Sequence, residues 1–165
     1  MKRFCKSMNA MLTMSGLTLV TATACSAQPA AVTGKTPCAI ARPTITRAAP
    51  ARWLGACSQG RAEGIGVLRI GTGEPYEFFF GEVRAGRPVR GLIKAINGWY
   101  PVARFDARMT AVNPRSWDPR QAHDLYVLAV KSAEATGRRF ATAGNLGSAR
   151  YYQRLARQIA EGEPE

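Results

Sequence analysis

Few side chains in this chain are of the types that catalysis uses, and their spacing does not bring them together. The 165 residues include a single histidine, His123, which is followed by Asp124. Adjacent residues on a helix do not face each other, and this stretch is expected to be helical. A thiol–imidazole pair of Cys57 with His123 would need a deep cleft, and such a cleft would indicate a small envelope hydrolase. A disulfide is the better use of Cys57 if the chain is exported.

The carboxylates offer no better catalytic site. Two pairs are spaced so that they could act as acid and base, namely Glu63 with Glu82 and Glu74 with Glu77. Both pairs fall in expected hairpin turns and strand edges, where carboxylates usually face water. We therefore expect that this chain is not an enzyme.

Metal and cofactor motifs are missing from the sequence. There is no Cys-x-x-Cys and no His-Glu-x-x-His, so we expect no metal site. Gly64-x-Gly66 and Gly71-x-Gly73 are not dinucleotide loops, because no helix is expected to follow them. We expect no cofactor.

The first 24 residues resemble a secretory signal peptide. Lys2, Arg3 and Lys6 form a basic head, and residues 10–22 form a short, mostly apolar run. This run is too short to span a bilayer, which takes about 20 apolar residues. We expect residues 1–24 to be removed on export to the periplasm.

The cleavage site can be read in two ways. Ala22-Thr23-Ala24 suits an ordinary signal peptidase, and with Cys25 it also resembles a bacterial lipobox, although the usual leucine three positions before the cysteine is missing. Either cut leaves Cys25, Cys38 and Cys57, an odd number in an oxidising compartment. We expect lipidation of Cys25, which would anchor the protein to the outer membrane, and a disulfide between Cys38 and Cys57. Residues 25–37 would form a flexible tether.

The chain is strongly basic, with a formal charge of +12. Removing the three basic residues of the signal peptide leaves 20 basic against 11 acidic residues, a charge of +9. This charge favours anionic neighbours such as acidic proteins, phospholipid head groups or lipopolysaccharide. Export excludes nucleic acid as a partner. An arginine-rich proteome would explain the same charge without any partner.

Residues 53–91 carry a repeated pattern of aromatic residues and glycines. The first copy has an aromatic residue followed by four glycines: Trp53, Gly55, Gly60, Gly64 and Gly66. The second copy begins 26 residues later and is degenerate: Phe79, Gly81, Gly86 and Gly91. Glycines that recur between apolar and aromatic runs indicate β-hairpins, with one tight turn expected between Gly60 and Gly64.

This pattern resembles the MORN repeat (membrane occupation and recognition nexus). The first copy matches the repeat position for position, and the resemblance covers about 40 of the 165 residues. It implies a stack of β-hairpins that binds protein or lipid and has no catalytic residues. We expect an antiparallel β-meander over residues 38–110.

Residues 111–165 are expected to form a helical hairpin. Asp118 and Pro119 provide an N-cap and a first helical residue, and apolar residues then recur at helical spacing as far as Phe140. A second helix would start at Asn145 or Ser148. The fold class is therefore α+β, with two C-terminal helices capping a repeat too short to stand alone.

The leading functional hypothesis is non-catalytic binding of a protein at the cell envelope, one version being inhibition of a secreted enzyme. The alternative is binding of anionic lipid or lipopolysaccharide. Aromatic candidates for a binding face on the sheet are Trp53, Tyr76, Phe78 and Phe80, although alternate ones must belong to the core. Basic candidates on the helices are Arg138, Arg139, Arg150, Arg154 and Arg157.

Overall fold

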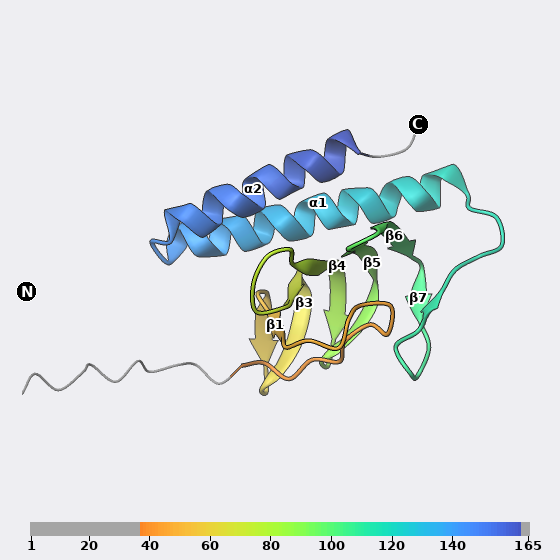
Figure 1. Ribbon diagram of the computed structural model, residues 1–165, viewed down its shortest axis with the longest axis horizontal. Helices are drawn as coiled ribbons and strands as arrows, with labels where there is room; N and C mark the ends of the chain where they lie inside the picture. Colours follow the sequence, from red (N-terminus) through yellow and green to blue (C-terminus); the bar gives the residue numbers. More distant parts are fainter. Residues whose placement is uncertain (1–36, 163–165) are drawn as a thin grey trace, which may run out of the picture. The chain divides into compact units, whose positions relative to one another are not determined.

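The computed structural model describes residues 37–162. The expected signal peptide, Cys25 and nearly all of the expected tether lie outside this range. The described chain has an antiparallel meander of strands followed by a two-helix hairpin, so the predicted α+β fold is confirmed (Figure 1). Neither helix in the described part is long and apolar enough to cross a membrane.

Six strands make the main sheet. They are β1 (Ala51–Trp53), β2 (Ala56–Ser58), β3 (Arg61–Ile70), β4 (Glu77–Arg84), β5 (Arg87–Ala95) and β6 (Gly98–Val102). Their order is β1-β3-β4-β5-β6, and β2 also pairs with β3. A separate ribbon joins β7 (Arg104–Phe105) to β8 (Ala111–Val112). The strand region thus ends at Val112, slightly beyond the predicted boundary at residue 110.

The two copies of the glycine pattern form hairpins with the same turn. Gln59 and Gly60 connect β2 to β3, and Ala85 and Gly86 connect β4 to β5. All four residues have positive φ, at 48° and 74° in the first turn and 47° and 78° in the second. Positive φ at both central positions is the type I′ geometry, whose twist matches that of paired strands. The prediction that Gly60 and Gly64 bracket the turn was wrong, because Gly64 lies within β3 and pairs with Val83.

The remaining glycines of the pattern lie side by side across the sheet. Gly66 pairs with Gly81, and Gly81 pairs with Gly91. The ring of Phe79 lies over Gly81, where a Cβ would come within 2.7 Å of its Cζ atom. In the first copy the ring of Trp53 covers Gly55 and Gly66 in the same way. The aromatic-x-glycine spacing therefore exists because a flat ring folds back over the strand two residues later.

Both faces of the sheet are buried. Side chains alternate along a strand, so Phe78 and Phe80 of β4 face one side and Phe79 faces the other. The first side packs against the helices, and the second against the segment before β1 and the β7–β8 ribbon. This is why β4 is apolar at consecutive positions instead of at alternate ones.

The helices are α1 (Pro119–Thr142) and α2 (Leu146–Glu161), which lie side by side and antiparallel (Figure 1). Asp118 caps α1 by accepting a bond from the backbone N–H of Arg120, as predicted, and the Asn145 side chain caps α2 by accepting from Ser148. The helices were expected to cap the short meander and pack against it. They do so by covering one face of the sheet, which Phe78, Phe80 and their neighbours leave apolar.

The segment before β1 is fastened at both hairpin turns. The backbone of Ala39 bonds to Gly60 and Ala62, and the N–H of Ala41 donates to the carbonyl oxygen of Gly86. Cys38 is bonded to Cys57 of β2, with 5.8 Å between their Cα atoms, so the predicted disulfide is present. The bond ties this segment to the strand that it borders.

Candidate functional site

The aromatic residues predicted to form an exposed binding face are mostly core. Phe78 is 1% exposed and Phe80 is fully buried beneath the helices. Trp53 is buried on the opposite face of the sheet, and its Nε1 donates to the carbonyl oxygen of Ala56 at 2.7 Å. These three predictions were wrong, because both faces of the sheet are covered. Tyr76 is half-buried and remains accessible.

Tyr76 lies in a groove between the β3–β4 turn and α2. The groove is open to solvent and has a volume of about 250 Å³, which suits a side chain or a small head group. Its lining comes from three elements, the turn, β5 and α2: Glu74, Pro75, Tyr76, Lys94, Tyr151, Arg154, Leu155 and Gln158. We call it the basic groove. It brings together two predicted binding residues, Tyr76 and Arg154.

Cations without acidic partners surround this groove. Lys94 lies 5.8 Å from the ring centre of Trp99, and the Arg69 guanidinium lies 4.8 Å from that of Tyr76. Within residues 37–162, neither these two cations nor Arg154 forms an ion pair. By contrast, Arg84 and Arg90, which lie away from the groove, both pair with Glu82, at 2.6 and 3.1 Å. The groove is therefore a place where positive charge is left for a ligand.

Two tyrosines of α2 form the wall above the sheet. Burial raises the pKa of Tyr151, and the nearby Glu74 carboxylate raises it further. Burial also raises the pKa of Tyr152, whose ring stacks on Phe140 and meets Phe78 edge-on. Both hydroxyls therefore stay protonated at neutral pH, and the half-buried Tyr151 offers the groove a neutral hydrogen-bond donor.

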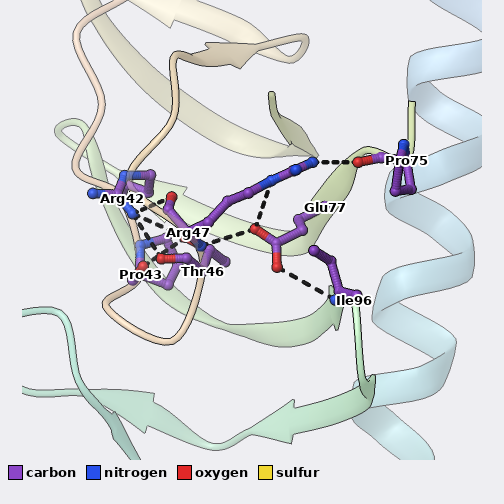
Figure 2. Close-up of polar contacts among 7 residues, drawn as sticks. All are labelled: Arg42, Pro43, Thr46, Arg47, Pro75, Glu77 and Ile96. Carbon is purple, nitrogen blue, oxygen red and sulfur yellow. Dashed lines mark hydrogen bonds and ion pairs between the residues drawn. The ribbon is translucent and has the colours of Figure 1, made fainter. Parts of the chain in front are cut away.

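A buried carboxylate fixes the turn that carries Tyr76. Glu77 is only 3% exposed, and its carboxylate accepts from the backbone N–H of Arg47 at 2.8 Å and of Ile96 at 3.3 Å (Figure 2). The Arg47 side chain pairs with Glu77 at 3.5 Å and also donates to the carbonyl oxygen of Pro75 (Figure 2). These bonds hold the loop before β1, the β3–β4 turn and the end of β5 together. The position of Tyr76 is set by this network rather than by the turn alone.

The other predicted arginines lie at separate places. Arg157 lines a hollow between α1 and α2, beside Glu134 and Gln153. Arg138 pairs with Glu134 at 3.5 Å, and Arg139 borders a hollow next to β1. Arg150 is exposed on α2. The five arginines therefore do not form one continuous face.

The predicted catalytic alternatives find no support in the geometry. Cys57 is bonded to Cys38, and His123 lies exposed on α1, so a thiol–imidazole pair does not form. The Glu77 carboxylate accepts hydrogen bonds from two backbone N–H groups, while Glu74 lies on the exposed turn. Among the described residues there is no cluster of three metal-ligating side chains.

The sequence did not identify Lys94, Arg69 or Tyr151 as residues of the site. Tyr151 and Arg154 are three residues apart, so their shared helix face could have been read from the sequence. Lys94 and Arg69 join the site through strand register, which no local pattern reveals. No protein-family model, curated protein or solved structure matches the chain.

Proposed function

We propose that this chain is a non-catalytic binding protein of the cell envelope. In this proposal a MORN-like hairpin sheet serves as the scaffold, and the basic groove holds another protein. The proposal rests on one observation: a single open groove is lined by Tyr76, Lys94, Tyr151 and Arg154. Tyrosine and arginine are the side chains on which protein interfaces most depend, because both combine a flat contact surface with directed hydrogen bonds.

The MORN-like part of the proposal is supported by the two hairpins. Their turns have the same backbone geometry, and in each copy an aromatic ring covers the glycine two residues later. The expected periplasmic location and the lipid anchor at Cys25 remain proposals that rest on the sequence of the first 25 residues.

Anionic lipid is the weaker candidate. A membrane-binding face would gather its cations on one surface, where each contributes to attraction by the anionic leaflet. Arg138, Arg154 and Arg157 lie in different surroundings, and one of them is already paired. A groove suits a protruding side chain of a partner protein better than a flat bilayer.

Affinity capture from intact envelopes of the native organism tests this function. Arg154→Glu reverses a charge inside the groove, and Arg157→Glu reverses one on the same helix outside it. We expect a protein that is enriched with the wild type and with Arg157→Glu but lost with Arg154→Glu. Identical captures with both variants, or capture of phospholipid in place of protein, would contradict the proposal.

A further inference from the structure

Two large apolar side chains are exposed together at the turn between β5 and β6. Ile96 is 66% exposed and Trp99 is 37% exposed, and both belong to one hairpin. The other large apolar residues that the described chain leaves exposed, Ile45, Ile65 and Leu146, come from three separate parts of the fold. Isolated exposed apolar residues are common on soluble proteins, so the adjacent pair is the one that indicates an interaction surface. We call Ile96 and Trp99 the apolar tip.

The apolar tip adjoins the basic groove. Trp99 pairs directly with Lys94 across β5 and β6, so both side chains point to the same face of the sheet. The Nζ atom of Lys94 lies 5.8 Å from the ring centre of Trp99, and Lys94 also lines the groove. The backbone N–H of Ile96 donates to Glu77, the residue that follows Tyr76 of the groove. Lys94 is therefore the shared border of the groove and the apolar tip.

Both residues of the apolar tip are held in place. The Trp99 ring lies on the core, with its centre 6.2 Å from that of the fully buried Phe80 ring. The Glu77 carboxylate accepts from the backbone N–H groups of Ile96 and Arg47, which fixes the β5–β6 turn to the loop before β1 (Figure 2). Groups that are already fixed lose little conformational freedom when a partner binds. Tryptophan is also one of the residues on which the binding energy of an interface concentrates.

The charges of the groove favour an anion but attract it weakly. Lys94 and Arg154 line the groove and form no ion pair within residues 37–162. Glu74 adds one negative charge to the lining from the exposed turn. An ion pair that is open to water contributes little affinity on its own. The groove therefore sets where an acidic side chain lies, and a partner needs a second, apolar contact to bind.

We propose that a partner protein docks here with an acidic side chain in the basic groove and a neighbouring large apolar side chain on the apolar tip. The acidic group would lie beside Lys94 and Arg154, and the apolar group would contact Ile96 and the Trp99 ring. This inference rests on the proposed function and names the chemistry of its partner, which is an acidic residue close to a large apolar one.

Three peptides test the two contacts, each blocked at both ends so that only a side chain carries charge. Gly-Phe-Ser-Glu-Gly has the acid and the ring, Gly-Ala-Ser-Glu-Gly keeps the acid alone, and Gly-Phe-Ser-Gln-Gly keeps the ring alone. Phenylalanine and glutamate are two positions apart, so both point the same way in an extended peptide. Titration into the purified ¹⁵N-labelled protein at low salt, where screening is weak, gives each dissociation constant from amide shifts. We expect the first peptide to bind roughly fivefold or more tightly than either of the others.

Two neutralising substitutions in the groove should act in opposite directions. Lys94→Gln removes a positive charge and should weaken the first peptide about fivefold, whereas Glu74→Gln removes the opposing carboxylate and should tighten it about twofold. Arg157→Gln, on α2 outside the groove, is the control and should leave the affinity unchanged. A Glu74→Gln variant that binds no tighter than the wild type would overturn the proposal.

Ile96→Ser tests the apolar tip. Leu146→Ser is its matched control, because Leu146 is exposed to a similar degree, 57%, at the start of α2. Ile96→Ser should weaken the first peptide about threefold or more and leave the acid-only peptide unaffected, and Leu146→Ser should change neither. Circular dichroism confirms that each variant is folded. Equal losses in both variants, or equal losses for the peptides with and without the ring, would overturn the proposal.

Vesicles containing phosphatidylglycerol test lipid as the other occupant, because an exposed tryptophan beside a lysine also suits a membrane surface. Vesicle binding that Ile96→Ser abolishes, without peptide binding, would overturn the proposal in favour of lipid. If envelope capture depends on Arg154 while no peptide distinguishes the variants, the proposed binding function stands and this inference falls. If the peptides bind as expected but no envelope protein is captured, the chemistry of the surface stands and the cellular function falls.

Discussion

Replacing Gly81 by alanine tests whether the glycine pattern exists to let aromatic rings and strands approach each other. A Cβ at this position would overlap the carbonyl oxygen of Arg90 and lie 2.7 Å from the Phe79 ring and 2.9 Å from the Cα of Gly91. The last two distances are well short of the ordinary contact distance of about 3.5–4.0 Å between carbon atoms. Two of the three neighbours are backbone atoms of β5, which cannot rotate away.

The cost follows from this geometry. Overpacking a core by a methyl group costs about 1–3 kcal/mol, and backbone neighbours place Gly81→Ala at the upper end, about 3 kcal/mol. For a folded region of this size, 1 kcal/mol corresponds to about 4 °C in melting temperature, so we expect a decrease of about 12 °C. Ring and strand must separate to admit the methyl group, so the core on this face loosens.

Gly73→Ala is the matched control. Gly73 lies exposed in the β3–β4 turn, and a Cβ there meets nothing within 4 Å. Exposed substitutions of this kind change stability by less than about 0.5 kcal/mol. Urea unfolding followed by circular dichroism gives both free energies, with unchanged m-values showing that the unfolded state is the same. Equal stability of the two variants would refute the idea that Gly81 is required for close packing.

Three further predictions concern stability. The Cys38→Ser, Cys57→Ser double variant opens a loop with 19 residues of sequence separation. It should lose about 3 kcal/mol in the free energy of unfolding by the chain-entropy estimate, and a loss below about 1 kcal/mol in urea unfolding would contradict this. Glu77→Ala leaves the N–H groups of Arg47 and Ile96 without their acceptor, so it should cost at least about 1–3 kcal/mol in thermal unfolding, whereas exposed Glu134→Ala should be nearly neutral. Burial raises the pKa of Glu82, but hydrogen bonds and charge attraction from Arg84 and Arg90 outweigh it, so the folded-state pKa lies below the ordinary 4.5. The stabilisation by Glu82 is therefore present above pH 4.5 and is lost as the pH falls through the lowered folded-state pKa, and acid titration of Glu82→Gln should show a smaller loss of stability over that range.

Much of the fold could be predicted from the sequence. The helix start at Asp118 was predicted from a local capping pattern and the disulfide of Cys38 with Cys57 from the number of cysteines, and both are present. Gly64 was misplaced because a glycine with positive φ occurs within a strand as well as in a turn, and the sequence does not distinguish the two.

The site was predicted less well because it depends on which elements lie together. Phe78 and Phe80 could be core or surface, and only the packing of α1 and α2 on that face decides it. Lys94 reaches the groove because β4 aligns it with Phe78, and register is fixed by pairing across the sheet. Tyr76 and Arg154 were found from their types alone, without the groove that joins them.

Site-specific photo-crosslinking in living cells tests most directly whether the basic groove is where a partner protein docks. A benzophenone amino acid at Gln158 would lie in the groove, and the same group at Gln153 would lie on α2 in the hollow outside it. We predict one discrete crosslinked protein from position 158 that Arg154→Glu abolishes, with no matching product from position 153. The same product from both positions, or a product from position 153 alone, would contradict the account.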